Sequence, residues 1–346
     1  MMKSCCANCI GDRGITREII PTLSSEVGTC LYCGTENIQL IQLSFLKSYF
    51  EQLANIYIRN QDGKSLVEWF KDDWDMFSHP SMDIAHSKEL LADILDDREI
   101  VRENFVPSDD CLSDGLERWE KLRSELMYEN RFFPQTEIDE ERLRGLLSHL
   151  LLGSDELHEI WYRARLQTMT EPFLPDDMGA PPKHLASQGR ANPAGIPYLY
   201  LASTIATAIS ELRPHTGDFA SVAEYCMSKN LKIIDLRNPR KTVSPFLLSD
   251  EREVALLRGD ISFLEQLGDE LTRPVLPQVA AIDYIPSQYI CEFIKKCGYH
   301  GVIYKSSVGD GINLAVFDPN IASALNVARY KVSRVSVEVS QQMDWL

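Results

Sequence analysis

Cysteine residues crowd the start of the chain at spacings that suit a metal ion. Cys6 and Cys9 form one Cys-x-x-Cys pair, and Cys30 and Cys33 form a second pair after a spacer of twenty residues. Two such pairs can place four thiolates in a tetrahedron around zinc, and such a site has no open coordination position. The spacing therefore predicts a structural zinc site that folds a segment too short to bury its own core. Cys5 is an alternative to Cys6 as a ligand, and reduced free thiols or a disulfide that depends on expression are the alternatives to a metal.

Polar side chains that could do chemistry recur on or beside the predicted strands of the last part of the chain. Arg163 and Arg165 alternate along a predicted strand at residues 160–166, so both side chains share one face. Tyr200 lies in a predicted strand at residues 198–202, and Glu211 ends the helix predicted after it. The other members of the set are Arg190, Arg213, Ser306, Ser307 and Asn313. Each residue alone is typical of a surface or core position, so the information lies in the order of the set.

The sequence predicts three parts of the chain, each with a different kind of structure. Residues 1–40 form the predicted zinc-binding segment. Residues 41–150 are predicted to be a helical domain, because apolar residues recur at steps of three and four from Leu40 to Tyr57, with similar stripes at 90–95 and 116–127. Residues 151–346 are predicted to be a mixed β-sheet domain, with strands at 160–166, 198–202, 231–236, 301–304 and 312–317 and helices at 204–212 and 286–296. Strands and helices do not alternate regularly, so the predicted fold class is α+β rather than a doubly wound sheet. The Pro- and Gly-rich segment at 167–196 is predicted to be a functional or disordered loop.

Charge and sequence patterns exclude several classes of protein. The chain has 35 basic and 51 acidic residues and a net charge of −16, which disfavours a nucleic-acid-binding or anionic-membrane surface. No run of eighteen apolar residues could span a membrane, and the start lacks the apolar core of a signal peptide, so we expect a cytoplasmic protein. The Gly-rich dinucleotide fingerprint, the phosphate-binding loop and the His-Glu-x-x-His motif are absent, which disfavours a dehydrogenase, an NTPase and a metalloprotease.

The order of the polar residues resembles the RES domain family. The matching pieces are Tyr-Arg-Ala-Arg at residues 162–165, the Gly-Arg-Ala-Asn-Pro segment that runs through residues 189–202, and Thr-Ala-Ile-Ser-Glu-Leu-Arg-Pro at 207–214. Residues 301–307 and 312–317 resemble the serine segment of the family, and the whole resemblance covers about residues 158–320. The Arg, Glu and Ser that name the family correspond to Arg163 and Arg190, Glu211 and Ser306, with Ser307 as the neighbouring alternative. The cysteine-rich start and the helical middle resemble the HEPN/RES N-terminal domain.

The resemblance implies a fold similar to ADP-ribosyltransferases and a toxin or anti-phage effector that consumes NAD. In that scheme Arg163, Arg165 and Arg190 bind the substrate, the guanidinium groups holding its pyrophosphate, and Asn313 is a further binding residue. The ring of Tyr200 packs on the nicotinamide, Glu211 stabilises positive charge at the anomeric carbon, and Ser306 binds the ribose or positions the nucleophile. Water as acceptor gives a glycohydrolase, phosphate a phosphorylase, and a protein side chain an ADP-ribosyltransferase. A toxin also implies an antitoxin or regulatory protein as partner.

Two other classes of function compete with this interpretation. Arg144 and His149 form an Arg-x4-His spacing, preceded by Arg142, that resembles the ribonuclease motif of HEPN domains. A non-enzymatic interaction protein would instead use the zinc segment near Cys30 and Cys33. Residues 41–150 carry a net charge of −11, and regulation, sensing of a trigger and oligomerisation are all left open for this acidic part.

Overall fold

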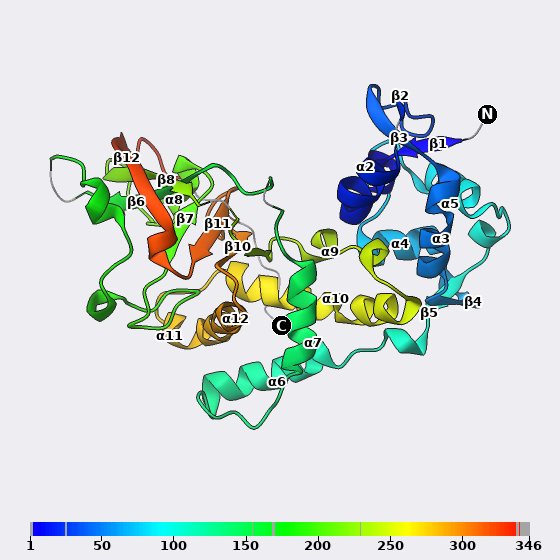
Figure 1. Cartoon of the computed structure of the whole chain (residues 1–346). Coiled ribbons are helices and arrows are strands. Elements are labelled where there is room, and N and C mark those ends of the chain that lie inside the picture. Colours follow the sequence, from blue (N-terminus) through cyan, green and yellow to red (C-terminus); the bar gives the residue numbers. More distant parts are fainter. Residues whose placement is uncertain are drawn as a thin grey trace. The chain divides into compact units, whose positions relative to one another are not determined.

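The chain forms two compact units in the computed structural model (Figure 1). The structure describes residues 3–24, 26–153, 155–167, 170–228, 230–336 and 339. The first unit comprises residues 1–150 and 238–268, and the second comprises residues 151–237 and 269–346. The chain thus leaves the first unit, builds part of the second, and returns to the first for residues 238–268. Across the described ranges, every helix is too short or too polar to cross a membrane.

A small antiparallel sheet stands at the start of the first unit. Its middle strand is β3 (Ile38–Gln42), which pairs with β1 (Ser4–Cys6) on one side and with β2 (Glu26–Gly28) on the other. Three short helical turns, α1 (Ala7–Ile10), η1 (Ile15–Ile19) and α2 (Ile20–Leu23), fill the connection between β1 and β2. Because side chains alternate across a strand, Cys5 and Cys6 leave β1 on opposite faces.

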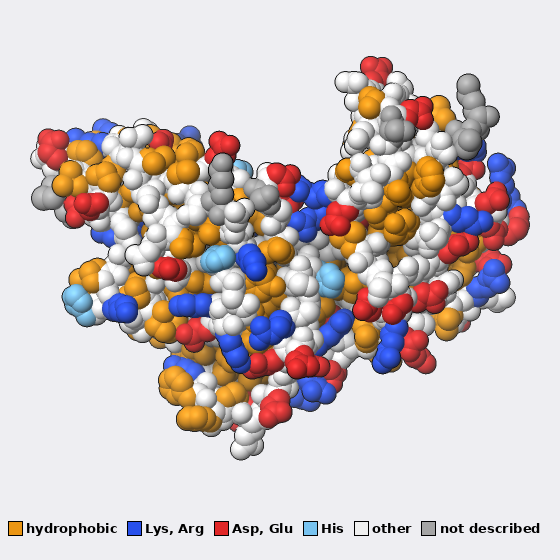
Figure 2. All heavy atoms as spheres, in the orientation of Figure 1, with side chains coloured by type: hydrophobic (Ala, Val, Ile, Leu, Met, Phe, Trp, Pro, Cys, Tyr) orange, Lys and Arg blue, Asp and Glu red, His pale blue; other side chains and the backbone are white. Residues whose placement is uncertain are grey.

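Helices make up most of the rest of the first unit. Several begin at side-chain caps, such as the capping box of Ser65 and Glu68 and the Asp83 and Asp139 caps. The helices are α3 (Leu43–Ala54), α4 (Leu66–Trp74), α5 (Ile84–Leu95), α6 (Gly115–Tyr128), α7 (Glu140–His149), α9 (Pro239–Thr242) and α10 (Glu251–Thr272), the last belonging to this unit through Gly268. On the face that Figure 2 shows, acidic and basic side chains are interspersed over this unit.

The apolar stripe from Leu40 to Tyr57, whose spacing indicates a helix, is divided among three elements and is helical only in its middle part, α3. Leu40 lies in β3, and Tyr57 begins β4 (Tyr57–Lys64), which pairs with β5 (Phe105–Pro107). Both side chains are buried, at 6% and 4% exposure. A buried residue in a strand is apolar, just as a buried residue in a helix is. The spacing of apolar residues alone therefore does not show where a helix ends.

A seven-stranded mixed sheet forms the second unit, in the order β12-β8-β6-β7-β11-β10-β9. The only parallel pair among the described strands is β9–β10. The strands are β6 (Ile160–Leu166), β7 (Leu199–Ala202), β8 (Phe219–Met227), β9 (Ile233–Asp235), β10 (Gly301–Lys305), β11 (Ile312–Val316) and β12 (Ala322–Lys331). The helices are α8 (Ile205–Ser210), α11 (Ala280–Asp283) and α12 (Ile285–Lys296). The predicted α+β class with a mixed sheet is confirmed, whereas β8 and β12 were not predicted.

The two faces of this sheet differ in what covers them. One face carries the larger apolar cluster, which includes Trp161, Leu201 and Leu314. The other carries Ala164 and Ala202, against which α8 packs. Small residues on this face let α8 approach the sheet closely, and α8 ends at the predicted site residue Glu211.

The sheet opens between β6 and β7. Strand β6 pairs with β8 at seven residue pairs, but among the described residues it meets β7 at Tyr162 opposite Ala202 alone. The two strands therefore separate on either side of that pair. The loop between them contains the 3-10 turns η4 (Pro175–Met178) and η5 (Lys183–Leu185) and returns the chain from β6 to β7.

Candidate active site

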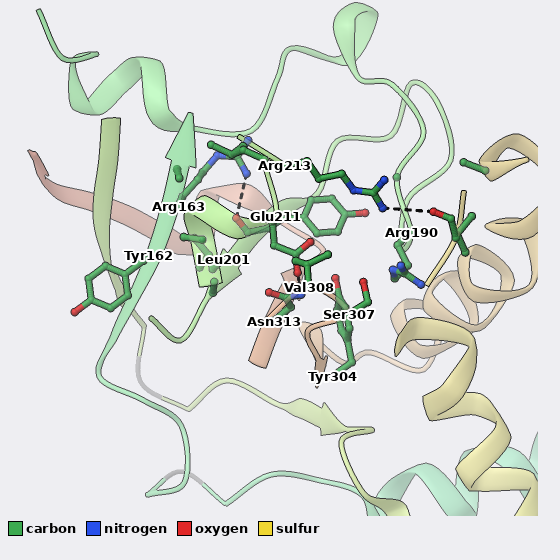
Figure 3. Close-up of a pocket in the computed structure, with 18 of the residues that line it drawn as sticks. Tyr162, Arg163, Arg190, Leu201, Glu211, Arg213, Tyr304, Ser307, Val308 and Asn313 are labelled. Atoms are coloured by element: carbon green, nitrogen blue, oxygen red, sulfur yellow. Dashed lines mark hydrogen bonds between the residues drawn. The ribbon is translucent and has the colours of Figure 1, made fainter. Parts of the chain in front are cut away.

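A cavity of about 520 Å³ lies within the second unit where β6 and β7 diverge (Figure 3). Its volume is in the range of small-molecule sites. Side chains reach it from the sheet, from the loop before β7, from the end of α8 and from residues 275–284. The lining residues are Tyr162, Arg163, Ala164, Gly189, Arg190, Tyr200, Leu201, Ala202, Ala208, Glu211, Leu212, Arg213, Val275, Pro277, Ala280, Tyr284, Tyr304, Ser307, Val308 and Asn313.

Glu211 provides a carboxylate that is held by two hydrogen-bond donors. Its backbone follows the last turn of α8, and its amide donates to the Thr207 carbonyl oxygen. Ser306 Oγ donates to Glu211 Oε1 at 2.7 Å, and Asn313 Nδ2 donates to the same oxygen at 2.6 Å. Both bonds use Oε1, and Oε2 takes part in neither. The carboxylate is therefore oriented, while its second oxygen is available to a ligand.

Arg163 extends from β6 across the opening towards β7. Its Nη1 donates to the backbone oxygen of Tyr200 at 3.0 Å, while its buried Nε has no hydrogen-bond partner among the described residues. Burial lowers the pKa of the Arg163 guanidinium below its ordinary value, and the neighbouring charge of Arg165 adds to this effect. Arg165 itself lies outside the cavity lining, where its Nη2 donates to the Gly179 oxygen at 2.8 Å. A buried cation with an unused donor is suited to an anionic ligand.

Tyr200 fixes the turn that carries Arg190. Its hydroxyl donates to Asn192 Oδ1 at 2.7 Å and accepts from the Ala191 amide at 2.9 Å. A Cβ atom on Gly189 would lie 2.6 Å from both Asn192 Oδ1 and the Tyr200 hydroxyl, so any larger residue there would displace this hydrogen-bonded pair. The hydroxyl of Tyr200 is thus occupied by the loop, and burial raises its pKa above the ordinary value. The ring of Tyr200 still lines the cavity, so its predicted contact with a nicotinamide stays a prediction.

Arg190 and Arg213 contact the wall formed by residues 273–284. Arg190 Nη1 donates to the Arg273 oxygen at 2.7 Å, and its guanidinium lies 5.4 Å from the centre of the Tyr284 ring. Arg213 Nη2 reaches the Val275 oxygen at 3.5 Å, and the Arg213 backbone has a positive φ of 50°. Left-handed backbone at a non-glycine residue is uncommon and concentrates at functional sites. Within the described residues, neither side chain forms an ion pair with a carboxylate.

The structure brings most of the predicted site residues together. Arg163, Arg190, Tyr200, Glu211 and Asn313 line one cavity. The two candidate serines have different surroundings. Ser306 donates a hydrogen bond to Glu211, whereas Ser307 lines the cavity.

Sequence reasoning missed two aromatic residues of the cavity and gave Arg213 no role. Tyr284 lies beyond any predicted motif. Tyr304 lies in a predicted strand, but its direction depends on the pairing of β10 with β11, in which Tyr304 faces Asn313. Strand alternation would have found Tyr304 only if that register had been known. The backbone conformation that brings Arg213 to the cavity has no signal in the sequence.

Four cysteines in the first unit form a cluster that could hold a metal ion. The sulfur atoms of Cys6, Cys9, Cys30 and Cys33 all lie within 4.8 Å of one another. The Cys6–Cys33 and Cys9–Cys30 sulfur distances are 3.4 Å, and the Cys6–Cys9 distance is 3.9 Å. Cys5 is buried but outside this cluster, since it leaves β1 on the other face. The geometry therefore favours Cys6 over Cys5 as the ligand.

The Arg-x4-His residues lie on α7 of the first unit. Arg144 is exposed, and His149 is partly buried at the end of the helix. Burial lowers the pKa of His149, and the charge of Arg142 lowers it further. Arg142 forms an ion pair with the buried Asp260, its Nε lying 2.8 Å from Oδ2. Residues five apart on a helix are about 140° apart around its axis, so Arg144 and His149 do not share a face.

A family model covers the part of the chain that forms this cavity. The model of the RES domain family matches residues 160–337, which include all the lining residues. A chain in the crystal structure of the M. tuberculosis MbcT–MbcA toxin–antitoxin complex is similar, with 13% identity and a TM-score of 0.33, over 57% of this chain and 94% of that chain. Among curated proteins, no match was found. The family model matches just over half of the residues of this chain, and the chain therefore belongs to the RES domain family.

Proposed function

We propose that this protein cleaves the nicotinamide–ribose bond of NAD. The observation that carries the proposal is the charge arrangement of the cavity. Arg163, Arg190 and Arg213 line it without carboxylate partners among the described residues, next to the oriented carboxylate of Glu211. A substrate with a pyrophosphate and a bond that breaks with positive charge on carbon suits both halves of this arrangement.

The chemistry follows from the carboxylate. As the bond from the anomeric carbon to the nicotinamide nitrogen breaks, its electron pair moves to the nitrogen, and nicotinamide leaves as a neutral molecule. The ribose develops oxocarbenium-like charge, which the carboxylate of Glu211 stabilises. The arginines would hold the phosphates, and thereby position the ribose over Glu211. Water or inorganic phosphate then completes a hydrolysis or a phosphorolysis, and a protein acceptor would make the enzyme an ADP-ribosyltransferase.

The test is product analysis with purified full-length protein and NAD, with and without phosphate. We expect nicotinamide to be released by the wild type and the rate to fall at least 10²-fold in Glu211→Gln, by analogy with the loss of an oxyanion-hole donor. Glu292→Gln is the matched control, because Glu292 is exposed on α12 and outside the cavity lining. ADP-ribose as product supports a hydrolase, and a phosphorylated product supports a phosphorylase. Equal rates in Glu211→Gln and the wild type would reject the assignment.

A toxin role follows if NAD is depleted in the producing cell, as expected from the NAD-degrading members of the family. We propose that a cognate antitoxin or regulatory protein restrains the enzyme. Expression of the wild type without that partner should lower cellular NAD and stop growth, whereas Glu211→Gln should do neither. Growth arrest by both variants would separate toxicity from the cavity.

Zinc is the metal that we propose for the four-cysteine cluster. Four thiolates match the structural zinc sites of proteins, and β1, α1 and β2 around the cluster are only three or four residues long. Bound zinc would tie β1 and α1 to the segment at Cys30 and Cys33. The role is structural, because four protein ligands leave no position for a substrate.

A further inference from the structure

The hydroxyl group of Tyr304 lies in the cavity without a protein partner. Tyr304 is only 4% exposed, and Figure 3 shows its side chain rising from β10 into the cavity. In the described part of the chain, no group forms a hydrogen bond with its hydroxyl. By contrast, the hydroxyl of Tyr200 is bonded to Asn192 and that of Tyr225 to the Met178 oxygen. The hydroxyl of Tyr304 is thus open to the cavity, where an acceptor atom of a ligand can take the hydrogen bond that no protein group takes.

The register of the sheet fixes where this hydroxyl lies. Tyr304 on β10 faces Asn313 on β11, which in turn faces Ala202 on β7. Directly opposed residues on neighbouring strands project from the same face, so the three side chains form one row across the sheet. Asn313 is the residue whose amide holds Glu211 Oε1. Tyr304 therefore stands beside the carboxylate, and the charge of Arg190 is also near Tyr304.

The phenol is a hydrogen-bond donor and not a base. Burial raises the pKa of Tyr304 well above its ordinary value, and the neighbouring Tyr200 and Glu211 raise it further, while the charge of Arg190 opposes the rise. A neutral phenol at physiological pH can donate its proton to an acceptor oxygen. The bond to nicotinamide breaks without the need for a proton, so a binding role suits this hydroxyl better than acid catalysis.

We propose that Tyr304 donates a hydrogen bond from its hydroxyl group to an oxygen atom of the nicotinamide riboside half of NAD. The identity of the ligand rests on the proposed function, and the position rests on the row with Asn313. The oxygen belongs to the ribose hydroxyls or to the carboxamide, both of which adjoin the anomeric carbon on which Glu211 acts. The adenylate half of NAD would then lie away from this hydroxyl.

The experiment measures binding by calorimetry in the Glu211→Gln background, which blocks turnover. We expect Tyr304→Phe to raise the Kd for NAD and for nicotinamide mononucleotide about 2- to 12-fold, the range of one neutral hydrogen bond, and to leave the Kd for ADP unchanged. The thermal midpoint should not fall, because no protein hydrogen bond is lost. Tyr198→Phe is the matched control, since its buried hydroxyl is also unpartnered among the described residues but lies outside the cavity lining. It should change neither quantity.

Each outcome decides a different point. Unchanged NAD affinity in Tyr304→Phe would overturn the role of the hydroxyl and leave the proposed function standing. Weaker ADP binding with unchanged nicotinamide mononucleotide binding would overturn its placement at the nicotinamide half. A fall in thermal midpoint as large as that of Tyr225→Phe, which loses a bond to the Met178 oxygen, would show that a protein group is the partner. If neither Glu211→Gln nor the wild type binds NAD, then NAD is not the ligand, and both the proposed function and the proposed role of Tyr304 are overturned.

Discussion

Replacing Tyr200 by Phe removes one hydroxyl group and, with it, two hydrogen bonds. The hydroxyl donates to Asn192 and accepts from the amide of Ala191, and both of these residues are buried, at 3% and 0% exposure. One neutral hydrogen bond contributes about 0.5–1.5 kcal/mol, so the loss should be about 1–3 kcal/mol. The upper half of that range is expected, because the amide of Ala191 is left buried and unpaired. A loss of about 2 kcal/mol corresponds to a fall of about 4–8 °C in the melting temperature of a unit of this size.

The same change should weaken substrate binding, because the turn that Tyr200 fixes carries Arg190. The ring remains, so any contact between its face and the nicotinamide is kept. Calorimetric melting of the wild type, Tyr200→Phe and Tyr225→Phe gives the comparison, since Tyr225 has a single bond to the Met178 oxygen. We expect Tyr200→Phe to be the less stable variant and to raise KM more than it lowers kcat. An unchanged melting temperature with a large loss of kcat would refute this reasoning and place the hydroxyl in the chemical step.

Burial raises the pKa of Asp12 to about 6, so the native state binds its proton more tightly than the unfolded chain does. The contribution of Asp12 to the stability of the fold is complete below about pH 4 and is lost as the pH rises through about 6. In a plot of melting temperature against pH, Asp12→Asn should flatten this part of the curve. Asn313→Ala should lower kcat about 10- to 100-fold, as expected for a buried donor to a carboxylate, and Ser306→Ala should lower it less. Cys30→Ser should abolish metal binding in elemental analysis and destabilise the first unit, whereas Cys5→Ser should retain the metal.

The strands that sequence reasoning found are those with a regular pattern. Strand β6 matches its predicted range of residues 160–166, and β7, β10 and β11 lie within two residues of theirs. Strand β8 is buried on both faces over much of its length, so its sequence shows no alternation. Strand β12 is an edge strand whose positions are mostly exposed or half-buried. Its polar residues obscure the apolar pattern by which a strand is predicted. Residues 238–268 belong to the first unit, and the spacing of apolar residues in the sequence does not show this either.

The site was predictable as a set of residues but not as a geometry. The order of arginine, tyrosine, glutamate and serine segments carries the resemblance, and the structure places most of them around one cavity. Which serine supports Glu211 depends on how the chain turns after β10, and the direction of Tyr304 depends on strand register. Both are properties of pairing between segments far apart in the chain, which no local pattern encodes.

The charge of the chain makes the unpaired arginines informative. Acidic residues outnumber basic ones by 51 to 35, so carboxylates are abundant, and Arg237 and Arg240 each pair with one, at 2.6 and 2.7 Å. Arg163, Arg190 and Arg213 line a cavity and, in the described ranges, bond to backbone oxygens instead. Holding like charges close together without counter-ions costs free energy, and an anionic ligand would offset that cost. A carboxylate introduced at the cavity wall by Ala280→Asp should therefore stabilise the second unit and, at the same time, weaken NAD binding.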